Sequence, residues 1–75
     1  MKVFVWQGYR QEAPGHKQTR EIVAVKSKNA VARIAGGKPF NLGETRNREE
    51  IELALSLPGT IFWRPLDESG PWNQG

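Results

Sequence analysis

Residues 2–9 of the chain read KVFVWQGY, and the fold prediction starts from this segment. β-Branched and aromatic side chains dominate it, and such side chains favour a β-strand. Because successive side chains of a strand point to opposite faces, Val3 and Val5 share one face while Phe4 and Trp6 share the other. Both faces are apolar near the start of the segment, so we predict a central strand of a sheet.

The segments that follow predict a β-hairpin. Residues 10–19 are mostly polar and contain Pro14-Gly15, a strong turn signal, so we expect an exposed loop there. Residues 20–25 read REIVAV and predict a second strand. Two strands joined in this way pair most simply in the antiparallel sense.

A first helix is predicted over residues 28–35. The Ser27 hydroxyl can accept a hydrogen bond from a backbone amide of the first turn, and Gly36-Gly37 supplies the stop. The apolar stripe at spacings of three and four comprises Val31, Ile34 and Ala35. The helix is short, so it needs packing against the rest of the domain.

A second helix is predicted to begin after Asn47. Asn47 and Glu50, three positions apart, resemble a capping box in which Asn replaces the usual Ser or Thr. Pro58-Gly59 ends this helix. Between the two helices, residues 38–43 are expected to be a connector whose Phe40 and Leu42 side chains fold back against the core.

The last strong strand pattern covers residues 60–64 and is stopped by Pro65. We therefore predict an α+β fold, a two-layer sandwich in which a three-stranded antiparallel sheet carries both helices on one face. The order along the chain is ββααβ, with the first strand in the middle of the sheet. Residues 1–66 form this single domain, and residues 67–75 are expected to be a loosely ordered C-terminal tail.

Charge is unevenly distributed along the sequence. Residues 1–40 contain eight Lys or Arg and two Glu, whereas residues 41–75 contain three Arg and six acids. The first part can therefore face a polyanion, and such charge blocks report on partners and solubility. Six basic residues are the candidate nucleic-acid contacts: Arg10, Lys17, Arg20, Lys26, Lys28 and Arg33. The alternative is that these charges are solvated and serve solubility alone.

Aromatic residues suggest a second kind of partner. Trp6 and Trp63 are expected to form a cross-strand pair on neighbouring strands. Trp72 lies in the tail, where it either docks on the sheet or anchors a partner, because Trp is enriched at the centres of interfaces. Trp63 and Trp72 are thus the candidate contacts of a protein-interaction or inhibitor module that acts on a host protein. A sheet face left open by the helices allows self-association as a homo-oligomer.

No catalytic constellation is found in the sequence, and we expect a non-catalytic protein without metal or cofactor. His16 is the single histidine, and nothing near it in the sequence completes a triad. Structural zinc needs three or four converging Cys, His or acid ligands, and the chain has no Cys. Gly36-Gly37-Lys38 lacks the glycine spacing and the Ser or Thr of a phosphate loop. The absence of Cys and of a long apolar segment favours a protein of the reducing cytoplasm, without a membrane anchor.

Four short segments resemble a group of viral proteins. Residues 20–24, 26–27, 32–36 and 62–67 are similar to small uncharacterised proteins encoded by bacteriophages of actinobacteria. The resemblance implies synthesis in the cytoplasm of a bacterial host and a role as an accessory or host-directed factor. It carries no activity and no functional residues over to this chain.

Overall fold

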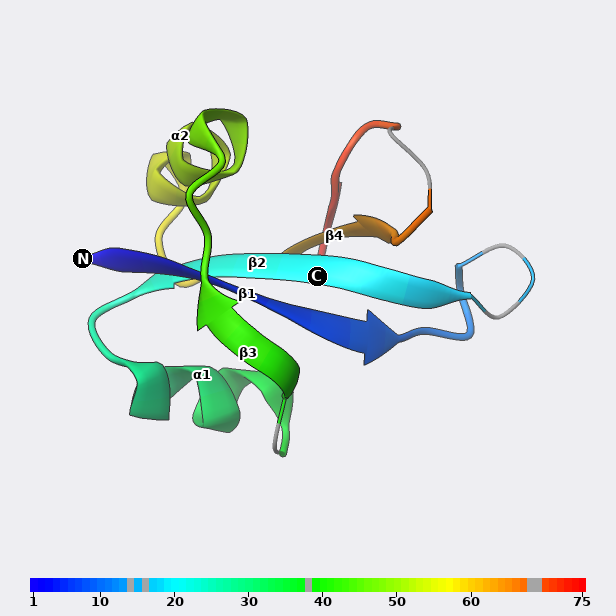
Figure 1. Cartoon of the computed structure of the whole chain (residues 1–75), viewed down its shortest axis with the longest axis horizontal. Helices are drawn as coiled ribbons and strands as arrows, with labels where there is room; N and C mark the ends of the chain where they lie inside the picture. Colours follow the sequence, from blue (N-terminus) through cyan, green and yellow to red (C-terminus); the bar gives the residue numbers. More distant parts are fainter. Residues whose placement is uncertain (14, 16, 38, 68–69) are drawn as a thin grey trace.

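Five antiparallel strands and two helices make up the described part of the chain, residues 1–13, 15, 17–37, 39–67 and 70–75 of the computed structural model. The elements are β1 (Lys2–Tyr9), β2 (Gln18–Val25), α1 (Lys28–Ala35), β3 (Phe40–Glu44), α2 (Arg48–Ser56), β4 (Phe62–Pro65) and β5 (Asn73–Gln74). The strand order in the sheet is β3-β1-β2-β4-β5 (Figure 1). Pro14 of the predicted turn, His16 and Lys38 lie outside the described residues.

The predicted hairpin and central strand are confirmed. β1 pairs antiparallel with β2 over its whole length, from Lys2 opposite Val25 to Tyr9 opposite Gln18. β3 pairs with the other edge of β1, so β1 has a neighbour on both sides. β1 is therefore an interior strand whose backbone is paired at both edges.

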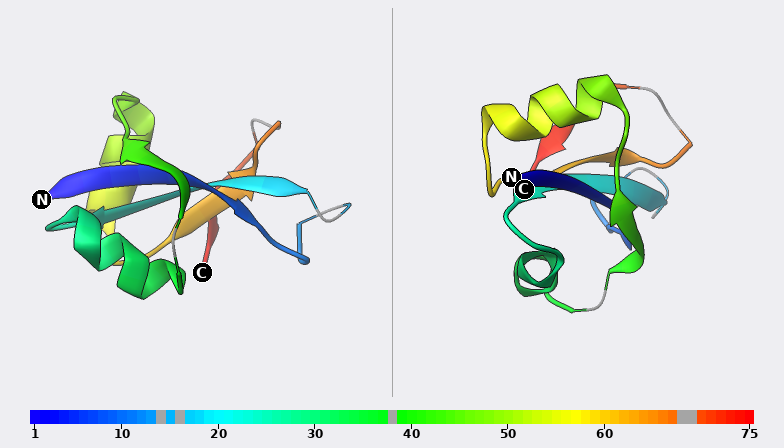
Figure 2. Two further views of the ribbon diagram at one scale, coloured as in Figure 1. Left: turned by 60° about the horizontal axis from the view of Figure 1, so that its bottom comes forward. Right: turned by 60° about the vertical axis from the view of Figure 1, so that its left-hand side comes forward.

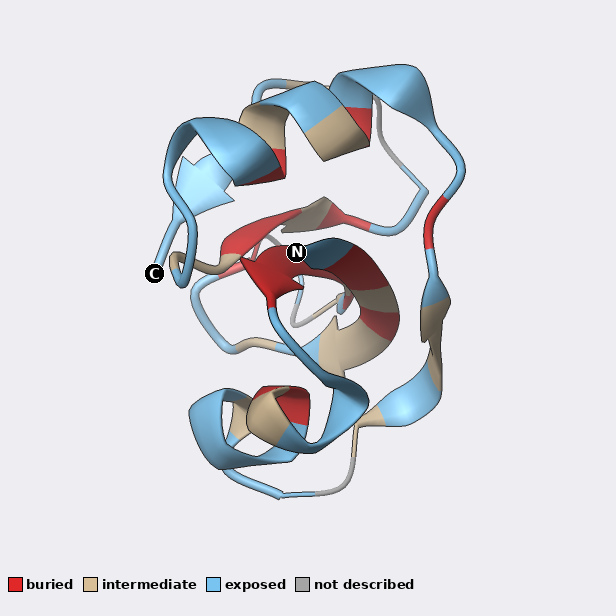
Figure 3. Cartoon of the chain, turned by 90° about the vertical axis from the view of Figure 1, so that its left-hand side faces the viewer, coloured by how far each residue is buried: buried red, intermediate tan, exposed pale blue. Residues whose placement is uncertain are grey.

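The two helices lie on opposite faces of the sheet (Figure 2). Seen from the end of the molecule, α2 and α1 are the outer layers and the buried strands lie between them (Figure 3). The class α+β holds, but the prediction of a two-layer sandwich with a three-stranded sheet and both helices on one face is wrong. Because both faces of β1 and β2 are apolar, each face requires its own cover.

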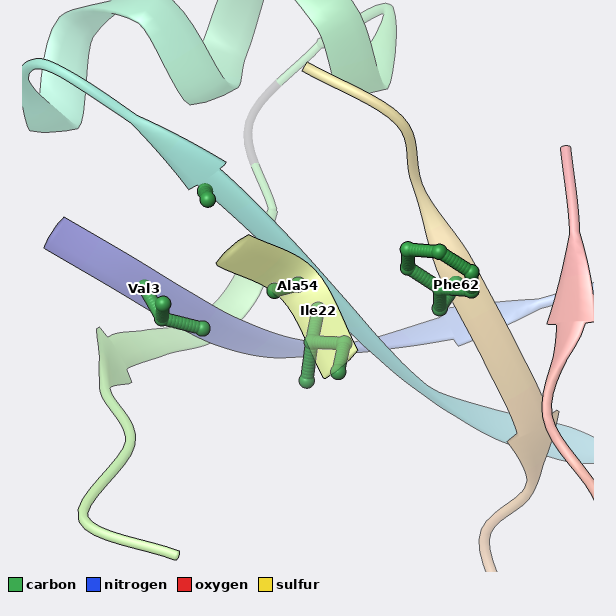
Figure 4. Close-up of a cluster of buried hydrophobic side chains, with 5 residues drawn as sticks. Val3, Ile22, Ala54 and Phe62 are labelled. Carbon is green, nitrogen blue, oxygen red and sulfur yellow. The ribbon is translucent and has the colours of Figure 1, made fainter. Parts of the chain in front are cut away.

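Two hydrophobic cores result from this arrangement. The core beneath α2 contains Val3, Ile22, Ala24, Ala54 and Phe62 (Figure 4). The core beneath α1 contains Phe4, Trp6, Val23, Val25 and Val31. The odd-numbered residue Val3 of β1 therefore packs in the core beneath α2, and the even-numbered residues Phe4 and Trp6 pack in the core beneath α1, as the alternation of side chains along a strand requires. The face that was expected to remain open for a homo-oligomer is the face on which α1 packs.

β3 occupies most of the segment that was predicted to be a connector. Its sequence FNLGE is a poor strand pattern, and Asn41 has a positive φ of 56°. The pairing of β3 with β1 shifts register between Val5 and Gln7, as at a β-bulge. As a result Phe40 is 65% exposed instead of folding into the core, whereas Leu42 packs against the core beneath α1.

The C-terminal segment joins the sheet. β5 pairs with β4, and the Gly75 amide donates to the Ile61 carbonyl at 3.0 Å, so the expected loose tail continues the sheet. β4 in turn pairs with β2, not with β1 as the predicted strand order required. β3 already occupies the free edge of β1, which leaves β2 as the edge available to β4.

The predicted helix ends agree with the structure in most details. Gly36 ends α1 in the left-handed conformation, with φ of 75°, and its amide donates to the Ala32 carbonyl. Asn47 caps α2 by accepting from the Glu50 amide at 3.1 Å. The capping box is incomplete, however, because the Glu50 carboxylate points to partners outside its own helix. Ser27 makes no side-chain cap bond.

Candidate functional site

A buried carboxylate lies on the α1 side of the sheet, near the hairpin end of β2. The Glu21 carboxylate accepts from Arg10 Nε at 2.8 Å and from Arg10 Nη2 at 3.0 Å, and Thr19 Oγ1 donates to it at 2.6 Å. Glu21 and Thr19 are both buried. Arg10 is therefore held by a two-point ion pair with a carboxylate that is almost withdrawn from water.

Two tryptophans flank this carboxylate. Trp6 lies opposite Glu21 on β1, and Trp63 lies opposite it on β4, so Glu21 separates the rings that were predicted to pair directly. The Arg10 guanidinium carbon stands 4.9 Å from the centre of the Trp63 ring, within cation–π range. The tryptophan rings and the Arg10 side chain together shield Glu21 from solvent.

A second ion pair lies on the α2 side of the sheet. The Glu50 side chain, 2% exposed, accepts from Arg20 Nε at 2.6 Å and from Arg20 Nη2 at 3.0 Å. Thr45 Oγ1 also donates to Glu50, at 2.6 Å. Each pair joins segments distant in sequence, and the second ties the sheet to the start of α2.

The ion pairs shift the pKa values of Arg10, Arg20 and Glu50. Hydrogen bonding to Glu21 raises the pKa of Arg10, and hydrogen bonding to Glu50 raises the pKa of Arg20. For Glu50, burial raises the pKa of the carboxyl, but hydrogen bonds from Arg20 and Thr45 outweigh it and the net pKa is lowered. Both arginines and Glu50 are therefore charged at neutral pH.

The lowered pKa of Glu50 predicts how stability depends on pH. Since its folded-state pKa lies below the value of 4.5 expected when it is solvated, the ionised pair stabilises the fold above that pH, and this contribution is lost as pH falls through the folded-state value. Urea unfolding followed between pH 7 and pH 3 should show this loss in the wild type. Glu50→Gln should flatten that part of the profile. The control is Glu52→Gln, which removes an exposed carboxylate of α2 outside the pair and should leave the loss of stability at low pH in place. An unchanged profile in Glu50→Gln would contradict the assignment.

The predicted basic residues do not form one patch. Arg10 and Lys17 lie at the hairpin end of β2, and Lys26 follows the opposite end of that strand, which spans about 23 Å at 3.3 Å per residue. Lys17 Nζ lies 3.9 Å from Asp67 Oδ2. Arg10 and Arg20 carry the buried pairs described above, on opposite faces of the sheet.

Three of the six candidates gather on one layer. Lys26, Lys28 and Arg33 are exposed on α1 and the turn before it, and no ion pair links them to an acid of the described residues. The sequence contains no Asp or Glu from Ile22 to Gly43. The acids Glu49, Glu50 and Glu52 belong to α2, on the other side of the sheet. The layered fold thus gives the α1 side an excess of positive charge.

A groove opens on the same side, where the C-terminal end of α1 approaches the second half of β1. It has a volume of about 390 Å³, and its lining includes Trp6, Tyr9, Gln18, Gly36, Gly37 and Phe40. A cavity of about 330 Å³ that shares Trp6, Gly8, Tyr9 and Ala35 with it extends to Arg10 and Glu21. Tyr9 and Phe40 are 64% and 65% exposed.

This groove was not predicted from the sequence. Tyr9 was placed only in the first predicted strand, and Phe40 was assigned to the core. The sequence does contain one indication that Phe40 is exposed. Its neighbours Pro39 and Asn41 are not apolar strand residues, so Phe40 does not belong to a core-facing pattern. An aromatic residue between two poor strand formers is a candidate for exposure.

The candidate partner contacts Trp63 and Trp72 are both engaged within the chain. Trp63 is 8% exposed, and its backbone carbonyl accepts from the Asn73 side-chain amide at 3.4 Å. Trp72 packs against the core beneath α2, and the Arg64 guanidinium carbon lies 4.3 Å from the centre of its ring. Of the two alternatives left open for Trp72, the structure has the ring docked on the protein's own sheet.

Comparisons with family models, with curated proteins and with solved structures found no match for this chain. Among the described residues, no group of three or more His, Asp or Glu side chains is placed to hold a metal ion. Within that same part of the chain, no helix combines the length and the apolar character needed to cross a membrane.

Proposed function

We propose that this chain is a non-catalytic nucleic-acid-binding protein that contacts phosphates through the α1 side of the sheet. The observation that carries the proposal is the separation of charge by the fold. Lys26, Lys28 and Arg33 lie on one outer layer without an acid partner among the described residues, while the glutamates of α2 lie on the opposite layer. Unpaired Lys and Arg on one face are what phosphate contact requires.

The proposed surface is smaller than the six residues identified in the sequence. Arg10 and Arg20 are each bound at two points by a buried carboxylate, so their charge is already neutralised within the domain. Releasing either arginine for a phosphate would leave a buried carboxylate without its partner, which is strongly unfavourable. We therefore assign these two arginines to the fold and the cations of the α1 layer to the ligand.

The mode of binding that fits this layer is general phosphate contact. α1 has eight residues, and its long polar side chains on the outer face are Lys28, Asn29 and Arg33. A helix that reads base edges in the major groove presents several such side chains at once. These two cations and one amide, together with Lys26 in the turn before the helix, suit a backbone contact with little sequence preference.

The alternative function is a protein-interaction or inhibitor module that acts on a host protein. Its candidate contacts were Trp63 and Trp72, and both rings are packed within this chain. No observation on the described residues favours it over phosphate binding. We also propose, from the resemblance to bacteriophage proteins alone, that the chain acts in the cytoplasm of a bacterial host.

The proposal predicts a charge-dependent affinity that resides on one face. Lys28→Gln/Arg33→Gln should weaken binding to a labelled single-stranded oligothymidylate. Each lost phosphate contact should also reduce the slope of log K against log salt concentration, by about 1.4 for the two together. Fluorescence anisotropy over a series of salt concentrations measures both effects.

The matched control is Arg46→Gln/Arg48→Gln, which removes the same charge from exposed positions at the start of α2. The proposal expects this control to bind nearly as the wild type does. Equal weakening by both double variants would show that net charge alone governs binding, and the α1 surface would have to be abandoned. No salt-dependent binding by the wild type would refute nucleic-acid binding altogether.

A further inference from the structure

We infer that the groove at the C-terminal end of α1 takes one unpaired nucleobase of a single strand. This inference rests on the proposed function, and it adds the ligand class: single-stranded nucleic acid, held by its bases as well as by its phosphates. The carrying observation is a groove lined by two exposed aromatic residues, Tyr9 and Phe40, at the end of the helix whose last turn carries Arg33.

The exposure of the two aromatic side chains has no explanation in the fold. Tyr9 is the last residue of β1 and Phe40 the first residue of β3, and these strands pair with each other through Gln7 and Phe40. Both residues line the same groove, and about two thirds of each remains in water. Aromatic rings that remain exposed beside a groove are suited to stacking on bases, which does not depend on sequence.

The lining of the groove suits a planar polar ligand better than an apolar one. Gln18 is among the lining residues, and its side-chain amide can both donate and accept. Gly36 and Gly37 end α1, where the last carbonyl groups have no amide partner within the helix. Nothing lies within 4 Å of a Cβ placed on either glycine, so a ligand can approach the backbone there. Exocyclic amino groups of bases can donate to such carbonyls.

Size and charge agree with the same ligand. A volume of about 390 Å³ lies at the small end of the range for ligand pockets and suits one base. Arg33 lies in the last turn of α1, three positions before Gly36 of the groove lining. A strand whose base enters the groove therefore places its adjacent phosphates beside the cations of the α1 layer.

The test compares two single strands of equal length: oligothymidylate and an abasic strand that keeps the sugar-phosphate backbone. The wild type should bind oligothymidylate about tenfold or more tightly than the abasic strand, as expected for one or more stacked bases. Tyr9→Ala and Phe40→Ala should each remove most of this difference while leaving affinity for the abasic strand unchanged. Leu57→Ala, at an exposed apolar residue after α2, is the matched control and should leave both affinities unchanged.

The outcomes separate this inference from the proposed function. Equal, salt-dependent binding of both strands by the wild type would overturn base insertion and leave phosphate contact standing. Failure to bind either strand would overturn both. If sedimentation shows a dimer that Phe40→Ala or Tyr9→Ala converts to a monomer, the rings serve a contact between copies of this chain, and base insertion is likewise overturned.

Discussion

Replacement of Arg20 by methionine is expected to lower the free energy of unfolding by about 3–5 kcal/mol, because it leaves a buried carboxylate without its cation. Glu50 is 2% exposed, and Arg20 provides two of its three side-chain hydrogen bonds. Methionine retains the apolar stem of the arginine, so the loss reports on the ion pair more than on packing. A domain of 75 residues has a total stability of about 4–11 kcal/mol, so this loss is a large fraction of the total. Urea unfolding followed by circular dichroism measures the change.

The control for Arg20→Met is the double variant Arg20→Met/Glu50→Leu. Replacing a buried ion pair by apolar residues of similar volume is often neutral or stabilising. The double variant should therefore recover most of the stability that the single variant loses. A loss below about 1 kcal/mol in Arg20→Met would mean that the pair behaves like an exposed surface ion pair, contrary to the burial of Glu50.

The sequence contained the information that the sheet is covered on both faces. In β1 and β2 the apolar residues occupy successive positions, as in Val3-Phe4 and in residues 22–25, and do not alternate with polar ones. Continuous apolar runs of this kind are typical of strands buried on both sides. The prediction of a two-layer sandwich used the order of the elements and neglected this pattern, which requires a third layer.

β3 and β5 could not be predicted from local sequence. Pro39, Asn41 and Gly43 surround or interrupt β3, and all three residue types are uncommon in strands. The strand exists because the free edge of β1 offers backbone partners and a register shift absorbs the irregular segment. β5 has two residues, which is too short for any periodic pattern.

The sequence also could not predict which basic residues form ion pairs within the fold. Arg10 and Glu21 are eleven positions apart, and Arg20 and Glu50 are thirty positions apart, so their pairing depends on strand register and on the placement of α2. Charge counts along the chain correctly indicated an excess of cations before residue 41. They could not show that Arg10 and Arg20 are neutralised by carboxylates within the fold. With these two arginines removed, the proposed phosphate-binding surface consists of the cations of the α1 layer.

Replacement of Gly8 by alanine is expected to destabilise the fold by about 3 kcal/mol, which combines overpacking with damage to charged hydrogen bonds. A Cβ at Gly8 would lie 2.6 Å from Glu21 Oε2, 3.0 Å from Glu21 Cδ and 3.0 Å from Thr19 Oγ1. The end of a glutamate side chain can normally move aside. Here Arg10 and Thr19 hold the carboxylate in a buried position, so moving it breaks those bonds. Thermal or urea unfolding of the variant measures the effect.

Gly43→Ala is the matched control, because Gly43 also lies in a strand of the sheet and nothing is within 4 Å of its Cβ position. It should change the free energy of unfolding by no more than about 0.5 kcal/mol. If the clash with Glu21 is the cause, Gly8→Ala should cost much less in a Glu21→Ala background than in the wild type. Equal effects of Gly8→Ala in both backgrounds would instead point to the backbone of β1. Gly8 also lines the groove and the adjoining cavity, and this cycle decides whether the buried carboxylate of the fold accounts for its missing side chain.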